Sequence, residues 1–187
     1  MKRHFGAIAA IAVALSACSP SNNQRDSQID TEPFQTPPIA TISLEGMREL
    51  IEGGRGSFLV VNLWATWCPP CVSEMPALAK FYRNQNDGEV TFLSFSADET
   101  DTIDELVKPF INSYEIPFPV WVMKSAEREE LNAAFEFGWD GLFPTTFLFT
   151  PSGALVQRWE GEVTFEALSE ALKEAQSAPA PQETALN

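Results

Sequence analysis

The feature that most constrains this chain is a pair of cysteines, Cys68 and Cys71, in the stretch WATWCPPCVSEMP. An apolar run rich in β-branched residues precedes the pair, and a helical pattern follows it. The sequence therefore predicts a strand that ends near residue 65 and a helix that begins just after Cys68. Pro69 suits the first position of such a helix, because a proline there loses no hydrogen bond. A fold that contains this junction must combine a sheet with helices.

Short apolar runs alternate with helical patterns along the rest of the ordered region. The strand before the cysteines is predicted at 58–65. Further strands are predicted at 90–95 and 118–123, with a β-hairpin formed by 145–149 and 154–159. Helices are predicted at 43–53, 72–84, 101–113, 126–137 and 164–176, the first and last with Ser43 and Thr164 as N-caps. Pro109 is expected to bend the third of these helices. The order of elements predicts an α/β fold with a mixed central sheet flanked by helices on both faces.

The composition limits the classes of protein to which the chain can belong. It has 187 residues, 44% of them hydrophobic, which is enough for one domain with a sizeable core and extensions. Its formal net charge is −14, so nucleic acid is excluded as a partner, since the phosphates would be repelled. The excess of acidic residues is interpreted as a solvated surface.

The N-terminal segment predicts export. Residues 1–17 have a basic start followed by an apolar run too short to span a bilayer, which is typical of a signal peptide. Leu15-Ser16-Ala17-Cys18 resembles the lipobox of bacterial lipoproteins. That resemblance implies cleavage before Cys18 and lipidation of this cysteine, and therefore a membrane anchor. The alternative is an ordinary signal peptide with a chance cysteine.

Three further segments are predicted from composition. Residues 18–39 are polar and rich in proline and form a flexible, lipidated tether. Residues 40–176 form the folded domain, and residues 177–187 are a disordered tail. Because Cys18 is used for lipid, no third cysteine remains for the pair at the helix start. Disulfides are permitted in the oxidising compartment outside the inner membrane.

Three chemistries compete for the Cys68–Cys71 pair. A structural zinc site needs about four ligands, but the only histidine, His4, is lost with the signal peptide. No metal is therefore expected, although copper(I) could use two thiolates. A purely structural role for a disulfide between these cysteines is poorly supported, because closing so short a loop removes little entropy from the unfolded chain and so stabilises the fold little. Cys-x-x-Cys at a strand-to-helix junction favours a redox dithiol.

Two stretches, VVNLWATWCPPCVSEMP and GLFPTTFLFTPSG, resemble the TlpA/ResA branch of the thioredoxin superfamily. The resemblance implies an extracytoplasmic thiol-disulfide oxidoreductase, often membrane-anchored, that needs no cofactor. It implies a thioredoxin fold with a central α/β insertion, here the helix at 101–113 and the strand after it. It also implies that Pro144 is a cis-proline that faces the dithiol.

Roles for individual residues follow from position and from the resemblance. Cys68 lies at the positive end of the helix dipole, where a thiolate is stabilised, and is the predicted nucleophile. Cys71 is the predicted resolving thiol and forms the redox disulfide with Cys68. Glu74 matches a glutamate that the branch places beside its dithiol, while Asn62 stands where thioredoxin itself has an aspartate. The alternative for Glu74 is an ordinary acid that is favourable with the helix dipole.

A substrate-facing surface is expected around the dithiol. Its predicted residues are Trp67, Pro69, Pro70, Phe143 and Pro144. Trp64 is predicted to pack in the core. Trp139 has two interpretations, either an apolar platform together with Phe143 or core packing.

The direction of electron flow is predicted from the dipeptide between the cysteines. Pro69 and Pro70 carry no N–H, so two donors that could stabilise the Cys68 thiolate are missing, and this favours a reductant. The resemblance implies protein disulfide substrates, as in cytochrome c or respiratory oxidase maturation, and an integral membrane thiol transporter as electron donor.

The expected location is the periplasmic side of a bacterial membrane. Ser19 follows the lipidated cysteine, and by resemblance to enterobacterial sorting it favours the outer membrane over the inner. The alternatives are a disulfide oxidase or isomerase, and a copper(I) metallochaperone or other binding module on the same fold. A peroxiredoxin fits less well, because its peroxidatic cysteine lacks so close a partner.

Overall fold

The computed structural model describes residues 34–86, 88–124 and 138–178. The predicted signal peptide, Cys18, Ser19, most of the tether, the helix at 126–137 and the end of the tail lie outside the described residues. The strands are β1 (Ile39–Ile42), β2 (Phe58–Trp64), β3 (Val90–Ser96), β4 (Val120–Met123), β5 (Thr145–Phe149) and β6 (Leu155–Glu160). The α-helices are α1 (Leu44–Gly53), α2 (Pro69–Arg83), α3 (Lys108–Ser113) and α5 (Phe165–Ser177).

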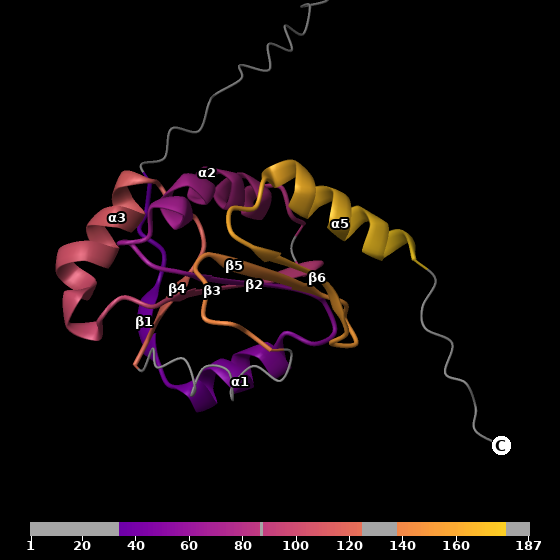
Figure 1. Cartoon of the computed structure of the whole chain (residues 1–187), viewed down its shortest axis with the longest axis horizontal. Helices are drawn as coiled ribbons and strands as arrows, with labels where there is room; N and C mark the ends of the chain where they lie inside the picture. The colour runs from indigo at the N-terminus through magenta and orange to yellow at the C-terminus, as the bar shows by residue number, and fades with distance from the viewer. Residues whose placement is uncertain (1–33, 87, 125–137, 179–187) are drawn as a thin grey trace, which may run out of the picture. The chain divides into compact units, whose positions relative to one another are not determined.

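The six strands form one mixed sheet in the order β1-β4-β3-β2-β5-β6. Figure 1 shows α2 and α5 over one face of this sheet and α1 against the other, as the sequence predicts. Ser43 caps α1 by accepting a hydrogen bond from the N–H of Gly46, and Thr164 caps α5 in the same way. Both predicted N-caps are therefore confirmed.

The sheet has a thioredoxin-like arrangement with an insertion. Strand β2 pairs parallel with β3 and antiparallel with β5, and β6 completes the hairpin. Strand β4 lies between β3 and β1 and is parallel to both. The expected α/β insertion is thus present as the helical segment 100–113 and the strand β4.

Two elements differ from the prediction. Residues 39–42 were expected to end the tether and begin the domain without a strand, yet Ile39 pairs with Val120 and Ile42 with Met123. The predicted single helix at 101–113 is a 3₁₀ turn (Thr100–Thr102), a π-helical turn (Ile103–Val107) and then α3. Pro109 lies at the start of α3, where its missing N–H costs little. The winding of this helical segment therefore changes just before the proline.

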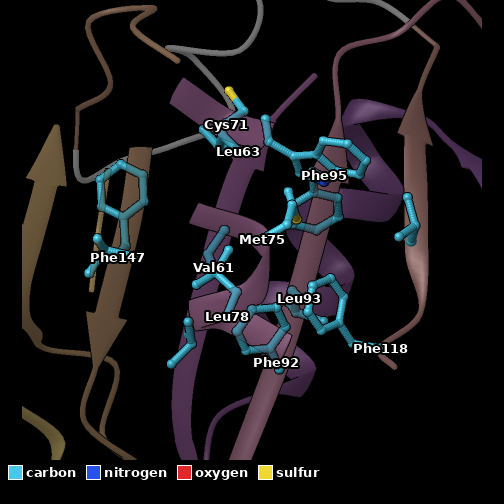
Figure 2. Close-up of a cluster of buried hydrophobic side chains, with 14 of the residues drawn as sticks. Val61, Leu63, Cys71, Met75, Leu78, Phe92, Leu93, Phe95, Phe118 and Phe147 are labelled. Carbon is cyan, nitrogen blue, oxygen red and sulfur yellow. The ribbon is translucent and has the colours of Figure 1, made fainter. Parts of the chain in front are cut away.

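The core lies between α2 and the central strands. Figure 2 shows Cys71, Met75 and Leu78 along the inner side of α2, beside Leu63 of β2 and Phe95 of β3. These five side chains are completely buried. Because Cys71 is part of this packed row, the start of α2 is held firmly against the end of the sheet.

Candidate active site

The two cysteines lie at the turn between β2 and α2. Cys68 is the N-cap of α2 and is joined by a disulfide to Cys71, with the Cα atoms 5.2 Å apart. The backbone N–H of Cys68 donates to the carbonyl of Ala65 at 3.3 Å, which closes the turn. Cys71 is fully buried, whereas 5% of Cys68 is exposed. Of the two cysteines, Cys68 is the one that keeps some exposed surface.

The hydrogen bonding of the Cys68 sulfur agrees with the argument from the two prolines. Its Sγ accepts a hydrogen bond from the N–H of Cys71 at 3.3 Å. Pro69 and Pro70 occupy the first two helical positions and have no N–H to offer. A thiolate at Cys68 would therefore be stabilised by the helix dipole and one backbone donor.

Glu74 lies on α2 one turn beyond Cys71 and is buried, with 2% of its surface exposed. Its Oε1 accepts from Nδ2 of Asn62 at 2.9 Å, and its Oε2 accepts from the N–H of Val163 at 3.0 Å. Burial raises the pKa of Glu74 from 4.5 to about 7; the bonds from Val163 and Asn62 act against this rise, and the charge of Glu162 adds to it. An acid that served only the helix dipole would lie in solvent near the first turn, so this alternative does not fit.

Asn62 connects Glu74 to the sheet. It is fully buried in β2 and lies directly opposite Thr146 of β5. Its Nδ2 donates to Oε1 of Glu74 and, at 3.0 Å, to Oγ1 of Thr146. In the sequence, Asn62 is a polar residue within a buried strand, at the position where thioredoxin itself has an aspartate, and these were the available signals for this network.

An aromatic surface adjoins the dithiol. Trp67, directly before Cys68, is 62% exposed and meets Phe143 edge to face, with ring centroids 5.8 Å apart. Phe143 also contacts Trp139 at 5.2 Å, and Trp139 is buried, so this residue both packs in the core and supports the platform. The Phe143–Pro144 bond is cis, as the resemblance implies for Pro144.

The remaining residues of the predicted surface differ in exposure. Pro69 is exposed, Pro70 is half-buried and Pro144 is buried. Trp64 is completely buried, and its Nε1 donates to Oγ of Ser94 at 2.8 Å, which confirms its prediction as a core residue.

Asp98, just after β3, supports the cysteine turn and was missed in the sequence. Its Oδ2 accepts from the N–H of Thr66 at 3.0 Å, and its Oδ1 accepts from the hydroxyl of Thr66 at 2.5 Å. Ser96 donates to the same carboxylate at 2.6 Å. Asp98 therefore ties the segment that precedes the nucleophile to the end of β3. An acidic residue directly after a buried strand was the only sequence signal for it.

Other kinds of site are less well supported. Within residues 34–86, 88–124 and 138–178, no three His, Cys, Asp or Glu side chains are grouped so that they could hold a metal ion. A groove of about 450 Å³ lies between α1 and the β5–β6 turn, lined by charged residues such as Arg48, Glu49 and Arg55. It includes none of the residues around the dithiol. No helix of the described residues has the length and apolar character needed to cross a membrane.

Comparison with known proteins places this geometry in a family. The AhpC/TSA family matches residues 39–158, which is more than half of the chain and includes both cysteines. The chain belongs to the AhpC/TSA family. This family member is 32% identical over 139 residues to thiol-disulfide oxidoreductase ResA of Bacillus thuringiensis subsp. konkukian, covering 74% of the chain and 75% of the relative. It is 24% identical over 138 residues to thioredoxin-like protein YneN of Bacillus subtilis, covering 74% and 76%.

Solved structures agree with the fold of this AhpC/TSA-family protein. A thioredoxin-related protein from Neisseria meningitidis serogroup B has a TM-score of 0.56 and 32% identity, covering 66% of this chain and 88% of that one. A thioredoxin-family thiol:disulfide interchange protein from Chlorobium tepidum has a TM-score of 0.54 and 25% identity, covering 78% and 98%. The protein is therefore a thioredoxin-like thiol-disulfide oxidoreductase.

Proposed function

We propose that this oxidoreductase reduces disulfides in protein substrates, with Cys68 as nucleophile, Cys71 as resolving thiol and Glu74 as the group that accepts the proton of Cys71. The observation that carries the proposal is the pair itself. Cys68, with 5% of its surface exposed, caps the start of α2, the fully buried Cys71 lies in the first turn, and the buried Glu74 follows one turn later on the same helix.

The first step is an attack by the Cys68 thiolate on one sulfur of the substrate disulfide. A mixed disulfide forms, the substrate S–S bond breaks, and the second substrate sulfur leaves as a thiolate that takes a proton from water. Trp67 and Phe143 offer an apolar contact surface to the substrate segment that carries the cysteine.

The second step is resolution. Glu74 in its ionised form takes the proton of Cys71, and the new thiolate attacks Cys68. The Cys68–Cys71 disulfide forms, the mixed disulfide breaks, and the reduced substrate leaves with two electrons from the dithiol. A carboxyl with a pKa of about 7 suits this role, because it exchanges protons readily at neutral pH. The rate of resolution across pH should differ between wild type and Glu74→Gln, and superimposable curves would remove Glu74 from the chemistry.

The direction of the reaction is proposed from the hydrogen bonds of the Cys68 sulfur. With one backbone donor and two prolines, the thiolate is stabilised less than in a strong oxidant. The reduction potential of the Cys68–Cys71 couple, measured against glutathione, is the decisive experiment. We expect a value nearer to about −270 mV, as in thioredoxin, than to about −120 mV, as in a strong oxidant. A value near the second figure would favour the oxidase or isomerase.

The location and partners belong to the same proposal. The protein is anchored by lipid at Cys18 on the periplasmic side of a bacterial membrane, with the residues between Cys18 and the folded domain as tether, and receives electrons from an integral membrane thiol transporter. Its substrates belong to cytochrome c or respiratory oxidase maturation. Support comes from the signal-like residues 1–17 and the lipobox-like residues before the cysteine. Globomycin should leave the precursor uncleaved, and a mature N-terminus elsewhere without added lipid would refute the anchor.

A further inference from the structure

Asn62 holds an oxygen atom that lacks a hydrogen-bond partner. In the described part of the chain, its Oδ1 is the single buried side-chain oxygen or nitrogen for which no partner is found. Buried polar atoms are almost always satisfied, so an exception needs a reason. The other end of the same amide is fully used, since Nδ2 donates to both Glu74 and Thr146.

The carboxyl of Glu74 faces a hydrogen-bond donor at each oxygen. Oε2 accepts from the backbone N–H of Val163, and Oε1 accepts from Asn62. Both bonds suit the ionised carboxylate, which only accepts hydrogen bonds. A neutral carboxyl carries an O–H that would point at a donor on either side. The neutral form is therefore bound less well than the ionised form unless its O–H also finds an acceptor.

Only one of these partners can change without moving the backbone. The N–H of Val163 is part of the chain and always donates. The Asn62 amide presents a donor at one end and an acceptor at the other, and a half turn exchanges the two positions. Thr146 allows this exchange, because its hydroxyl accepts from Nδ2 in one orientation and can donate to Oδ1 in the other.

We propose that Asn62 is a positioning residue for Glu74, whose amide turns over when the carboxyl takes a proton on Oε1 and turns back when the proton leaves. In the turned state Oδ1 occupies the present place of Nδ2 and accepts from the O–H of Glu74 and from the hydroxyl of Thr146. Oδ1 then accepts two bonds in place of the two that Nδ2 donates now, while Nδ2 moves to the present place of Oδ1, for which no partner is found among the described residues. The unused Oδ1 is the acceptor required by the other protonation state. The proposal rests on the role of Glu74 as proton acceptor of Cys71.

The groups around Glu74 decide how easily the two states exchange. On α2, Cys71 lies one turn earlier and is the source of the proton. From the loop after β6, the charge of Glu162 raises the pKa of Glu74, while the N–H of Val163 lowers it. From β2, Asn62 lowers this pKa as long as it donates. An amide that can turn serves the neutral form as well, so neither form is left with opposed donors.

The test is an NMR titration of the oxidised protein with labelled Glu carboxyls and Asn side-chain amides. In this form Cys68 and Cys71 are joined and do not titrate, and the chain has only one histidine, His4. We expect the Glu74 carboxyl and the Asn62 amide signals to move with the same midpoint. Nuclear Overhauser contacts from the Asn62 amide protons to Glu74 should be present above that midpoint and lost below it. Amide signals and contacts that stay constant through the titration would overturn the proposal.

A substitution of Asn62 tests the same coupling through its effect on the titration midpoint of Glu74. Asn62→Leu replaces the amide by an apolar side chain of similar size, so both forms of Glu74 lose a hydrogen bond. Because the bond to the ionised carboxylate is the stronger one, the midpoint of Glu74 should rise by about one pH unit. Thr146→Val is the matched control, because it keeps the bond between Asn62 and Glu74 and should move the midpoint less. An unchanged midpoint in Asn62→Leu would also overturn the proposal. The wild-type titration needs no substitution and decides the matter even where Asn62→Leu folds poorly.

The proposed function and the role of Asn62 can fail separately. The titration is made in the disulfide form, where no thiol chemistry takes place. Resolution rates in Glu74→Gln test the catalytic role of Glu74 alone. Unchanged resolution together with a coupled titration would remove Glu74 from the mechanism and leave the positioning by Asn62 intact.

Discussion

The buried carboxyl of Glu74 should make the stability of the oxidised protein depend on pH in a direction opposite to that of a salt-bridged acid. In the unfolded chain this group titrates at about 4.5, and in the folded protein its pKa is about 7. Between these values the unfolded chain has lost the proton while the folded protein keeps it. The folded state thus binds more protons, and the free energy of unfolding falls as pH rises through this window.

The size of the change in the free energy of unfolding follows from the difference between the two pKa values. Each pH unit corresponds to about 1.4 kcal/mol, so a displacement from 4.5 to about 7 corresponds to a loss of about 3 kcal/mol. This contribution is fully present below pH 4.5 and is lost above pH 7. The hydrogen bonds from Asn62 and Val163 are already part of this balance, because they lower the pKa from a still higher value.

The assay is urea unfolding of wild type and Glu74→Gln, without reductant, at pH values from 4.5 to 8. The glutamine does not ionise, so the difference between the two free energies of unfolding should change by about 3 kcal/mol across this range. Glu170→Gln, which removes an exposed carboxyl from α5, is the matched control for the loss of one acid. Parallel curves for wild type and Glu74→Gln would show that Glu74 ionises as an ordinary carboxyl, and the case for it as a proton carrier would be lost.

Three further outcomes are expected. Cys71→Ser should accumulate mixed disulfides with substrate on non-reducing gels, and Cys68→Ser should not; insulin reduction by Cys68→Ser would contradict the assignment. Asp98→Asn should lower the free energy of unfolding by about 1–3 kcal/mol and slow insulin reduction, because a buried charged acceptor of the cysteine turn is lost; unchanged reduction would limit Asp98 to stability. Leu78→Ala, in the core behind the dithiol, should cost about 2–5 kcal/mol in urea unfolding and leave the reduction potential unchanged.

Several helices could be predicted because the sequence signals for their first residues are local. The caps Ser43 and Thr164 and the strand-to-helix junction at Cys68 each depend on residues within one turn. Strand β1 has no such support. Its four residues, IATI, follow Pro37 and Pro38 and become a strand only through pairing with β4, about 80 residues later.

The site was predicted in part for a similar reason. The placement of Cys68 and Cys71 at the start of a helix follows from their spacing, and the cis bond before Pro144 follows from resemblance alone. The burial of Glu74 could not be predicted, because a glutamate in an amphipathic helix is usually exposed. Its surroundings come from β2, β5 and the loop at Val163, and these meet only in the folded protein. Asp98 was missed because its partner Thr66 lies in the turn after β2, whereas Asp98 itself follows β3.

Strand β1 also protects the sheet against unwanted association. It is hydrogen-bonded to β4 at the end of the strand order. β4 has the sequence VWVM, without a charge or a proline, and three of its four residues are buried. A fragment that began after Ile42 would leave this strand as an open edge, whose free N–H and C=O groups could template pairing with a second copy. The short segment at the start of the domain thus acts as a barrier to aggregation, and soluble fragments should begin before Ile39.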